Sequence, residues 1–462
     1  MTLVERNHEY KFCRGTTPAD TGGDNLRMRL VLRSIAGTSA LVLISFAACS
    51  SGDSGPKAGI KIGVDLPLSG AEGRAGTPTL NGVRFFVHQH PVIDGFNVVV
   101  SARDDAANGI HDPKLGAQNI SAFVSDPLVM GVIGPFDSSV ARAAIPRANQ
   151  AHLAMVSPSA SNQCLTKPTF LPAGLSPTRR SIGCQEVGLP LPADLRPTKV
   201  NNFFRLATTD DLQGAAAADY GYQKLNLLRV AVLSDHEAYG QALAYGFRTR
   251  FNKLGGLVVL YQDFTPAGKL DLTAFFNQAK KEGAQAIYFG GVTANNGCSI
   301  RAKMAAVFGA ATPYLGGDGI AEDPACVRDA GTNAAGVYAT VPAVDAEQAP
   351  TAKAAIAAFK AEYTRASDFG PYTMLAYDAT AVIYDALDRA IKEAGGKLPA
   401  RADVVAKLAA TTAFQGVTGT FGFDPAGDTT HRIVSIFESK SSDPGAPWPW
   451  VGAVDYSSKL PY

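Results

Sequence analysis

The sequence has 462 residues, of which 46% are hydrophobic, and its 42 Lys and Arg residues nearly balance 41 Asp and Glu residues. This length suffices for two domains with sizeable cores. The near-neutral charge gives no electrostatic reason to expect a nucleic-acid partner, because such binding needs a basic surface that displaces counterions. After the N-terminal region, no apolar run approaches the ~20 residues that span a bilayer.

The N-terminal region has the pattern of an export signal that ends at Cys49. Arginines precede an apolar segment at residues 35–46, and small residues lead to the cysteine. The stretch resembles a bacterial lipobox, in which the cysteine accepts lipid, although Phe46 stands where leucine is usual. The alternative is a plain secretory signal whose cysteine falls near the cleavage point. We expect a signal peptide at 28–48, a flexible tether at 49–58, and an extension from a misplaced start codon at 1–27.

Export to an oxidising compartment predicts disulfides among the remaining cysteines. After Cys49, the cysteines are Cys164, Cys184, Cys298 and Cys326. Four cysteines allow three pairings, and proximity favours Cys164–Cys184 and Cys298–Cys326. No pair has CxxC spacing, which argues against a zinc site and against thioredoxin-type chemistry. We therefore expect no metal and no cofactor.

From Ile60 onward, short apolar strands alternate with Ala-rich helical segments. The strands begin the segments IKIGVDLPLSG, VMGVIGPFDSS, HLAMVSPSAS, LRVAVLSDHEAYG, AIYFGGVT and PYLGGDG. Helices are expected at residues 81–90, 113–125, 140–149, 241–254, 272–282, 298–308 and 373–394. Strands that are apolar on both faces are typical of a parallel sheet, and the alternation with helices predicts α/β architecture.

Small polar residues follow several of these strands, where open parallel sheets bind their ligands. The residues at these strand ends include Ser69, Ser138, Ser139, Ser159, Ala160, Ser161, Asp235, Tyr239 and Asp318. Taken singly, each of them is better explained as a helix cap or a turn residue than as a ligand contact. Together they fall in two βα blocks, at 60–161 and 202–319, which indicates a shared binding site. The Pro- and Gly-rich segment 162–200 between the blocks is interpreted as a disulfide-pinned insertion at the rim of the first lobe.

The order of these motifs resembles the type I periplasmic binding-protein fold, specifically the solute-binding lipoproteins of branched-chain amino acid ABC importers. The resemblance covers residues 59–440 and includes DDAANGIHDPKLGAQNI, FFRLATTDD, PYTMLAYDATAVIYDAL and FQGVTGTFGFDPAGD. It implies two Rossmann-like α/β lobes, joined by three crossovers, with a ligand cleft between them.

The resemblance also implies limits for the lobes. Lobe 1 is expected to contain residues 60–200 and 337–419, and lobe 2 residues 201–336 and 420–440. Residues 441–462 are expected to form a C-terminal tail.

The resemblance assigns ligand contacts residue by residue. Members of the family hold the carboxylate of an amino acid at a helix N-terminus and its ammonium with an acid. The matching positions are Ser138, Ser139, Ala160 and Ser161 in lobe 1, and Tyr239 and Asp318 in lobe 2. Two aromatic walls are missing, because Ala75 stands at one matching position and Val292-Thr293 at the other. Glu72 and Arg74 can reach that space but are interpreted as an exposed charge pair on the loop.

The sequence lacks GxSxG, HExxH and GxxxxGK[ST], so we expect no enzyme. The resemblance implies an exported, lipid-anchored protein at the outer face of the cytoplasmic membrane. It would capture an amino acid or a related small amide or acid for an ABC permease and its ATPase subunits. The alternative is a receptor module of the same fold that signals to a membrane partner.

Overall fold

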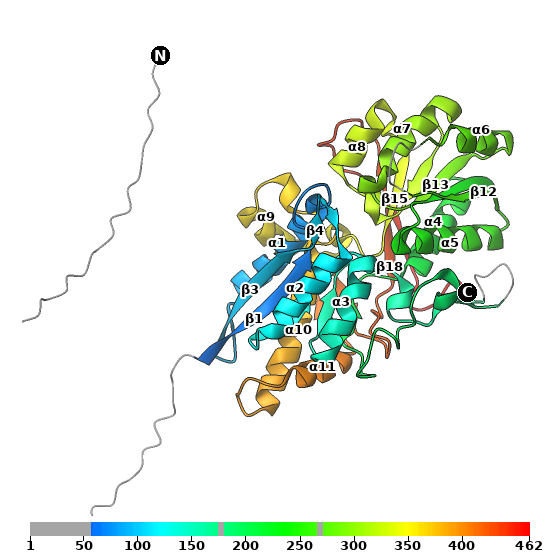
Figure 1. Ribbon diagram of the computed structural model, residues 1–462. Helices are drawn as coiled ribbons and strands as arrows, with labels where there is room; N and C mark the ends of the chain where they lie inside the picture. Colours follow the sequence, from blue (N-terminus) through cyan, green and yellow to red (C-terminus); the bar gives the residue numbers. More distant parts are fainter. Residues whose placement is uncertain (1–56, 174–179, 266–270) are drawn as a thin grey trace, which may run out of the picture. The chain divides into compact units, whose positions relative to one another are not determined.

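The computed structural model describes residues 57–173, 180–265 and 271–462 (Figure 1). The expected signal peptide and Cys49 lie outside these residues, so lipid attachment stays a prediction. Within the described ranges, no helix combines the length and the apolar content that a membrane span requires.

The first lobe is built on a mostly parallel sheet with the strand order β10-β7-β6-β1-β3-β2. Its strands are β1 (Lys57–Leu66), β2 (Val92–Ile93), β3 (Phe96–Asp104), β6 (Val129–Ile133), β7 (Met155–Ser157) and β10 (Phe203–Arg205). Its helices are α1 (Gly73–Gln89), α2 (Pro113–Ser125), α3 (Ser138–Gln150), α10 (Thr373–Glu393) and α11 (Arg401–Ala409). Every residue of β6 is buried, which requires helices on both faces of the sheet.

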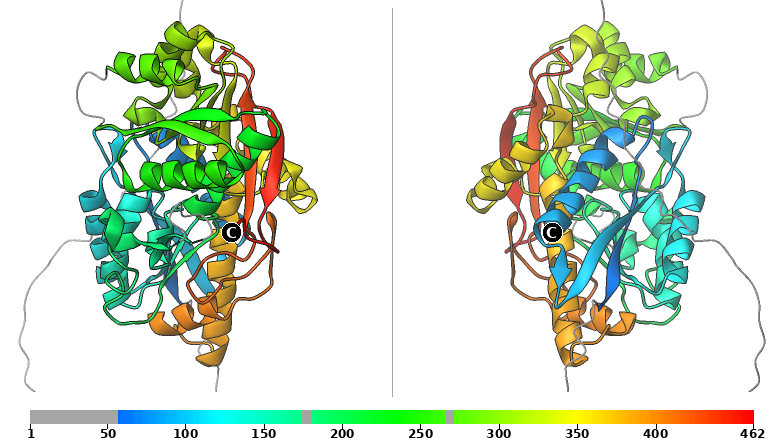
Figure 2. Two further views of the ribbon diagram at one scale, coloured as in Figure 1. Left: turned by 90° about the vertical axis from the view of Figure 1, so that its right-hand side faces the viewer. Right: turned by 90° about the vertical axis from the view of Figure 1, so that its left-hand side faces the viewer.

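The side chains of β6 divide between the two faces, and a register shift after Val129 interrupts strict alternation. Met130 and Ile133 pack in the core cluster that contains α1 and α10, and Val129 and Val132 pack in the cluster formed by α2 and α3. Helix α10 therefore lies against the sheet beside α1, as its long orange ribbon shows in Figure 2.

The second lobe has a sheet with the strand order β12-β11-β13-β14-β15-β18-β19, parallel up to β15 and antiparallel beyond it. Its strands are β11 (Arg229–Ser234), β12 (Leu257–Asp263), β13 (Ala286–Gly290), β14 (Tyr314–Gly316), β15 (Val337–Val341), β18 (Ile433–Ser439) and β19 (Trp450–Asp455). Its helices are α4 (Asp210–Gln223), α5 (Ala238–Lys253), α6 (Thr273–Lys281), α7 (Gly297–Phe308) and α8 (Pro324–Ala330). The predicted α/β class with two parallel-sheet lobes is confirmed.

Smaller elements complete the described structure. They are helix α9 (Lys353–Glu362) and the strand pairs β4 (Ala106–Ala107) with β5 (Ile110–His111), β8 (Thr169–Leu171) with β9 (Ile182–Gly183), and β16 (Phe414–Gly416) with β17 (Gly419–Phe421). Of the expected helices, α2 has the expected limits, whereas α1 begins earlier than residue 81. Helices α4, α8, α9 and α11 were not expected.

The described chain crosses between the sheets after β10, after β15 and before β18, and these crossovers lie side by side. Thr208 N donates to Pro342 O (2.7 Å), and Thr208 Oγ1 donates to Ile433 O (3.0 Å). Ser435 N donates to Ala343 O (3.1 Å). These hydrogen bonds join the crossovers into one hinge region, which fits the predicted crossover topology.

Strand pairing corrects some of the expected lobe limits. β10 was expected in lobe 2 but pairs in parallel with β7 of the first sheet, and β15 was expected in lobe 1 but pairs with β14 and β18 of the second. The expected tail contributes β19 to the second sheet. The physical reason is that a short apolar strand can pair in either sheet. Its own residues therefore do not specify which sheet it joins.

The described part of segment 162–200 packs on both lobes: Leu165 and Leu195 lie in the lobe 1 cluster, as expected, and other residues of the segment contact lobe 2. Phe170 contacts Tyr245 of α5, with ring centroids 5.5 Å apart, and Asn162 Nδ2 donates to Ala238 O (2.7 Å). The Cys164–Cys184 disulfide lies in the same buried cluster. Both favoured disulfides, this one and Cys298–Cys326, are present.

Candidate ligand-binding cleft

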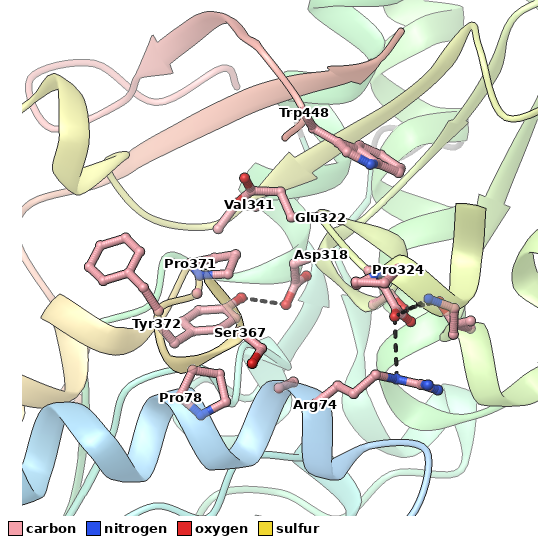
Figure 3. A pocket seen from close by; sticks show the side chains of 18 of the residues that line it. Arg74, Pro78, Asp318, Glu322, Pro324, Val341, Ser367, Pro371, Tyr372 and Trp448 are labelled. Carbon is pink, nitrogen blue, oxygen red and sulfur yellow. Dashed lines mark hydrogen bonds and ion pairs between the residues drawn. The ribbon is translucent and has the colours of Figure 1, made fainter. Parts of the chain in front are cut away.

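A cleft of about 1710 Å³ lies between the lobes, at the carboxyl ends of both sheets (Figure 3). Of the predicted ligand residues, Ser138 and Ser161 line it from lobe 1, and Tyr239 and Asp318 line it from lobe 2. Strands of both sheets end at this gap, so the structure brings together residues that are far apart in the sequence. Ser139 and Ala160 are buried and do not belong to the lining.

Asp318 forms the centre of the lobe 2 wall, in the short 3₁₀ turn that follows β14. Its carboxylate accepts hydrogen bonds from Gln213 Nε2 (2.8 Å), from Tyr239 OH (2.6 Å) and from Tyr372 OH. Tyr372 is the N-cap residue of α10 in lobe 1, so its hydroxyl bridges the cleft (Figure 3). Within the described residues, no Lys, Arg or His forms an ion pair with this carboxylate.

Burial dominates the acid–base properties of this cluster. It raises the pKa of Asp318 above its usual value, although the hydrogen bonds from Tyr239, Tyr372 and Gln213 act in the opposite direction. Burial and the neighbouring Asp318 charge also raise the pKa values of Tyr239 and Tyr372 well above 10, so both phenols are neutral donors. An ionised Asp318 therefore has neutral hydrogen-bond partners and lacks a compensating positive charge.

The lobe 1 wall is the N-terminal turn of α3. Ser138 is the first helical residue, and its Oγ accepts a hydrogen bond from Asn162 N (3.1 Å). Asp137 is the N-cap residue, but its side chain makes no capping hydrogen bond to the helix. The positive end of the helix dipole and unpaired N–H groups make such a turn suited to an anion.

Ala160 does not offer its backbone to the cleft, which corrects its expected role. Its N–H donates to Ser157 Oγ (2.9 Å), and its carbonyl accepts from Arg205 Nη1 (3.0 Å). Arg205 is fully buried and also donates to Asp428 Oδ1 (2.7 Å). Burial alone would raise the pKa of Asp428, but Arg205 and Lys167 hold it below its usual value. This buried ion pair fixes the loop that presents Ser161.

Aromatic residues that the sequence did not single out form further walls of the cleft. Phe136 packs edge-on against Tyr372, with ring centroids 5.2 Å apart. Trp448 is 5% exposed and points toward the cleft from the Pro-rich segment that precedes β19 (Figure 3). Ala75 and Val292, which stand where the family has aromatic walls, also line the cleft.

Glu72 and Arg74 are not an exposed pair with each other. Arg74 Nε lies 3.5 Å from Asp323 Oδ1, which joins α1 of lobe 1 to α8 of lobe 2. Figure 3 shows Arg74 extending toward the segment that carries Pro324. The Glu72 side chain is only 12% exposed and lies beside His111. Two residues of lobe 1 therefore contact acidic residues of lobe 2 across the cleft: Arg74 contacts Asp323, and Tyr372 contacts Asp318.

The sequence matches the family model described as periplasmic binding protein over residues 59–182 and 187–444. The chain belongs to the periplasmic binding protein family. This periplasmic binding protein is 29% identical, over 86% of its length and 95% of the relative, to Leu/Ile/Val-binding protein homolog 3 of Brucella melitensis. Its family places it outside the cytoplasm as a solute-binding protein rather than an enzyme.

Solved structures of similar fold carry different ligands. The branched-chain amino acid transporter substrate-binding protein LivJ of Streptococcus pneumoniae, in complex with isoleucine, gives a TM-score of 0.66 at 23% identity, covering 85% of this chain and all of LivJ. A solute-binding protein of an ABC transporter from R. palustris, in complex with 4-hydroxybenzoate, gives 0.67 at 19% identity, covering 86% of this chain and 96% of that one. These likenesses concern the fold of this periplasmic binding protein. Its ligand has to be argued from its own cleft.

Proposed function

We propose that this protein captures an amino acid, or a related small ligand that carries an ammonium group, and delivers it to an ABC permease with its ATPase subunits. The observation that carries the proposal is the uncompensated Asp318 carboxylate in a cleft between two lobes. A buried carboxylate without a countercharge is costly, and a ligand ammonium would supply that charge. Relatives named for leucine, isoleucine and valine agree with this chemistry.

The charges of the cleft favour an ammonium ligand over a simple aromatic acid. Four basic side chains line the cleft: Arg74, Lys360, Arg365 and Arg328. The first three are each paired with a carboxylate, whereas Arg328 has no ion pair within the described residues. Asp318 and Asp137 remain on opposite walls without a Lys or Arg partner among the described residues. A benzoate would pair with Arg328 but would leave Asp318 without a countercharge, so the Asp318 carboxylate favours the ligand that carries an ammonium group.

The same ligand would place its carboxylate at the N-terminal turn of α3. Ser138 and Ser161 present hydroxyl groups there, opposite Asp318 and Tyr239. Charge-assisted hydrogen bonds from hydroxyl and backbone N–H groups are the usual partners of a buried carboxylate. Aliphatic or aromatic side chains of the ligand would then extend toward Trp448.

Ligand binding would shift the protein toward a closed form that docks on the permease. A ligand that touches both walls binds the closed form more tightly and therefore raises its population. The Tyr372–Asp318 hydrogen bond and the Arg74–Asp323 ion pair join the lobes in the same way and would add to the stability of that form.

A thermal-shift panel of amino acids, amides and hydroxybenzoates tests the proposal. A ligand at about 100 times its Kd adds about 2.7 kcal/mol to stability. We expect shifts with one or more amino acids, and we expect the Ser138→Ala/Asp318→Asn double variant to lose them. A shift with hydroxybenzoates alone, or a shift that survives the double change, would contradict the proposal.

We also propose that Cys49 carries a lipid anchor that holds the protein on the outer face of the cytoplasmic membrane. Several acyl chains are needed for stable attachment, because a single chain binds a membrane only reversibly. The test is mass spectrometry of the mature N-terminus together with fractionation of cells. The wild type should be found in the membrane fraction with a lipidated Cys49, and the Cys49→Ser variant should not.

A further inference from the structure

Three side chains with metal-binding atoms meet on the lobe 1 wall of the cleft. Glu72 is the N-cap residue of α1, His111 ends β5, and Asp137 is the N-cap residue of α3. His111 Nδ1 lies 3.0 Å from Glu72 Oε2 and 3.5 Å from Asp137 Oδ1, and one ligand atom from each side chain lies within 4.8 Å of the others. Their side chains are between 10% and 16% exposed.

These distances suit a tetrahedral metal ion. Zinc binds imidazole nitrogen and carboxylate oxygen at about 2.0–2.2 Å, which sets neighbouring donor atoms of a tetrahedron roughly 3.3 Å apart. The measured separations from His111 Nδ1, 3.0 Å and 3.5 Å, lie on either side of that value. One imidazole with two carboxylates is also a donor set for borderline ions such as Zn²⁺, whereas Ca²⁺ and Mg²⁺ prefer oxygen alone.

A buried carboxylate beside this cluster lacks any hydrogen-bond partner. Asp105 is fully buried, and neither of its carboxylate oxygens has a hydrogen-bond partner. All three residues of the cluster, Glu72, His111 and Asp137, act electrostatically on this carboxylate, as does Asp65. Asp137 Oδ2 is likewise buried and without a hydrogen-bond partner.

The charge balance of this region supports the same conclusion. Within the described residues of this region, the four carboxylates of Asp65, Glu72, Asp105 and Asp137 face the single imidazole of His111. Buried carboxylates are stabilised by a paired cation or by a metal ion. A divalent cation would neutralise the negative charge of Glu72 and Asp137 by direct coordination. It would also stabilise the Asp105 carboxylate electrostatically without binding to it.

We propose that Glu72, His111 and Asp137 bind one divalent transition-metal ion of the zinc type, with Asp105 as an outer carboxylate. The ion would lie at the cleft surface, because Glu72 and Asp137 both line the cleft. A fourth coordination position would then be open to water or to an oxygen of the bound ligand. The inference does not depend on which organic ligand the cleft takes.

The test uses tag-free protein that has been stripped with EDTA and dialysed. Zn²⁺ is titrated by calorimetry, and Co²⁺ is added as a spectroscopic probe because its visible absorption reports the coordination geometry. We expect one equivalent of each ion to bind, with a Co²⁺ spectrum of low coordination number. His111→Gln should weaken binding at least ~10-fold, since even residues behind metal ligands change affinity by about 10–100-fold.

The matched control is His236→Gln. His236 also lies beside a carboxylate, 3.7 Å from Asp263 Oδ2, but is 61% exposed and away from the cluster. Its loss should leave the affinity unchanged. If His111→Gln does not fold, Glu72→Gln and Asp137→Asn carry the same test. Absence of stoichiometric binding to the wild type, or equal affinity in the His111 and His236 variants, would overturn the proposal. An amino-acid shift that persists in EDTA would leave the proposed function intact in that case.

Discussion

Replacing Asp318 by asparagine removes one charge from the cleft while keeping its hydrogen-bond geometry. The asparagine oxygen can still accept from Gln213 and Tyr239, and its amide can donate to the Tyr372 oxygen, so the fold is expected to survive. Loss of the charged partner of a buried ammonium costs about 3 kcal/mol, within the usual ~2–5 kcal/mol. This corresponds to a roughly 150-fold higher Kd for an amino acid.

The assay is isothermal titration calorimetry with the amino acid that stabilises the wild type most. Asp323→Asn is the matched control, because Asp323 also lines the cleft but is paired with Arg74 and caps α8. Asparagine is an equally good cap, so this variant should stay within a few-fold of the wild type. Equal affinities for Asp318→Asn and Asp323→Asn would refute the ammonium assignment.

The pH dependence of binding gives the same prediction an independent readout. Because burial raises the pKa of Asp318, part of the carboxylate is protonated at a pH where an ordinary aspartate is ionised. An ammonium ligand needs the ionised form, so its affinity should increase as pH rises through this raised pKa. The Asp318→Asn variant should lack this increase.

Three further predictions concern the walls, the charge and the crosslinks of the described structure. Trp448→Ala should weaken binding of apolar amino acids by at least ~10-fold, because it removes a buried aromatic wall of the cleft. Trp450 also lines the cleft but is 39% exposed, so Trp450→Ala should have a smaller effect in the same calorimetry. Burial raises the pKa of Asp235 to about 6 and that of Glu322 to about 8, so the folded state binds more protons than the unfolded state above pH ~4. Stability should fall as pH rises from 5 to 8, and an equal or higher Tm at pH 8 would contradict this. Reduction of the disulfides, which span 20 and 28 residues, should cost about 3 kcal/mol each in denaturant titrations, and an unchanged midpoint would contradict that estimate.

The sequence predicted helix limits correctly where capping residues and proline, which act on neighbouring residues, set those limits. Helix α2 has the expected limits because Asp112 caps it and Pro113 stands at its first position, both of which are visible in the sequence. Helix α1 begins at Gly73, before its apolar period starts, because its first turn packs against the loop after β1. No periodic pattern marks such a start.

Strand membership and the site walls depended on contacts between distant residues. Short strands such as β10 and β15 are apolar in either sheet, so the sequence could not assign them to a lobe. Strand-end residues such as Ser138 and Asp318 were found because parallel strands end at one edge. Tyr372 and Trp448 precede a helix and a strand, where no such rule applies. Ala160 was misassigned because the partner of its carbonyl, Arg205, comes from another strand.

A crystal structure of the protein with its best amino acid ligand tests the central claim most directly. The account predicts the ligand nitrogen within hydrogen-bond distance of the Asp318 carboxylate and the ligand carboxylate at Ser138, so that one molecule touches both lobes. A ligand that binds elsewhere, or that touches only one lobe and leaves Asp318 without a cation, would contradict the account.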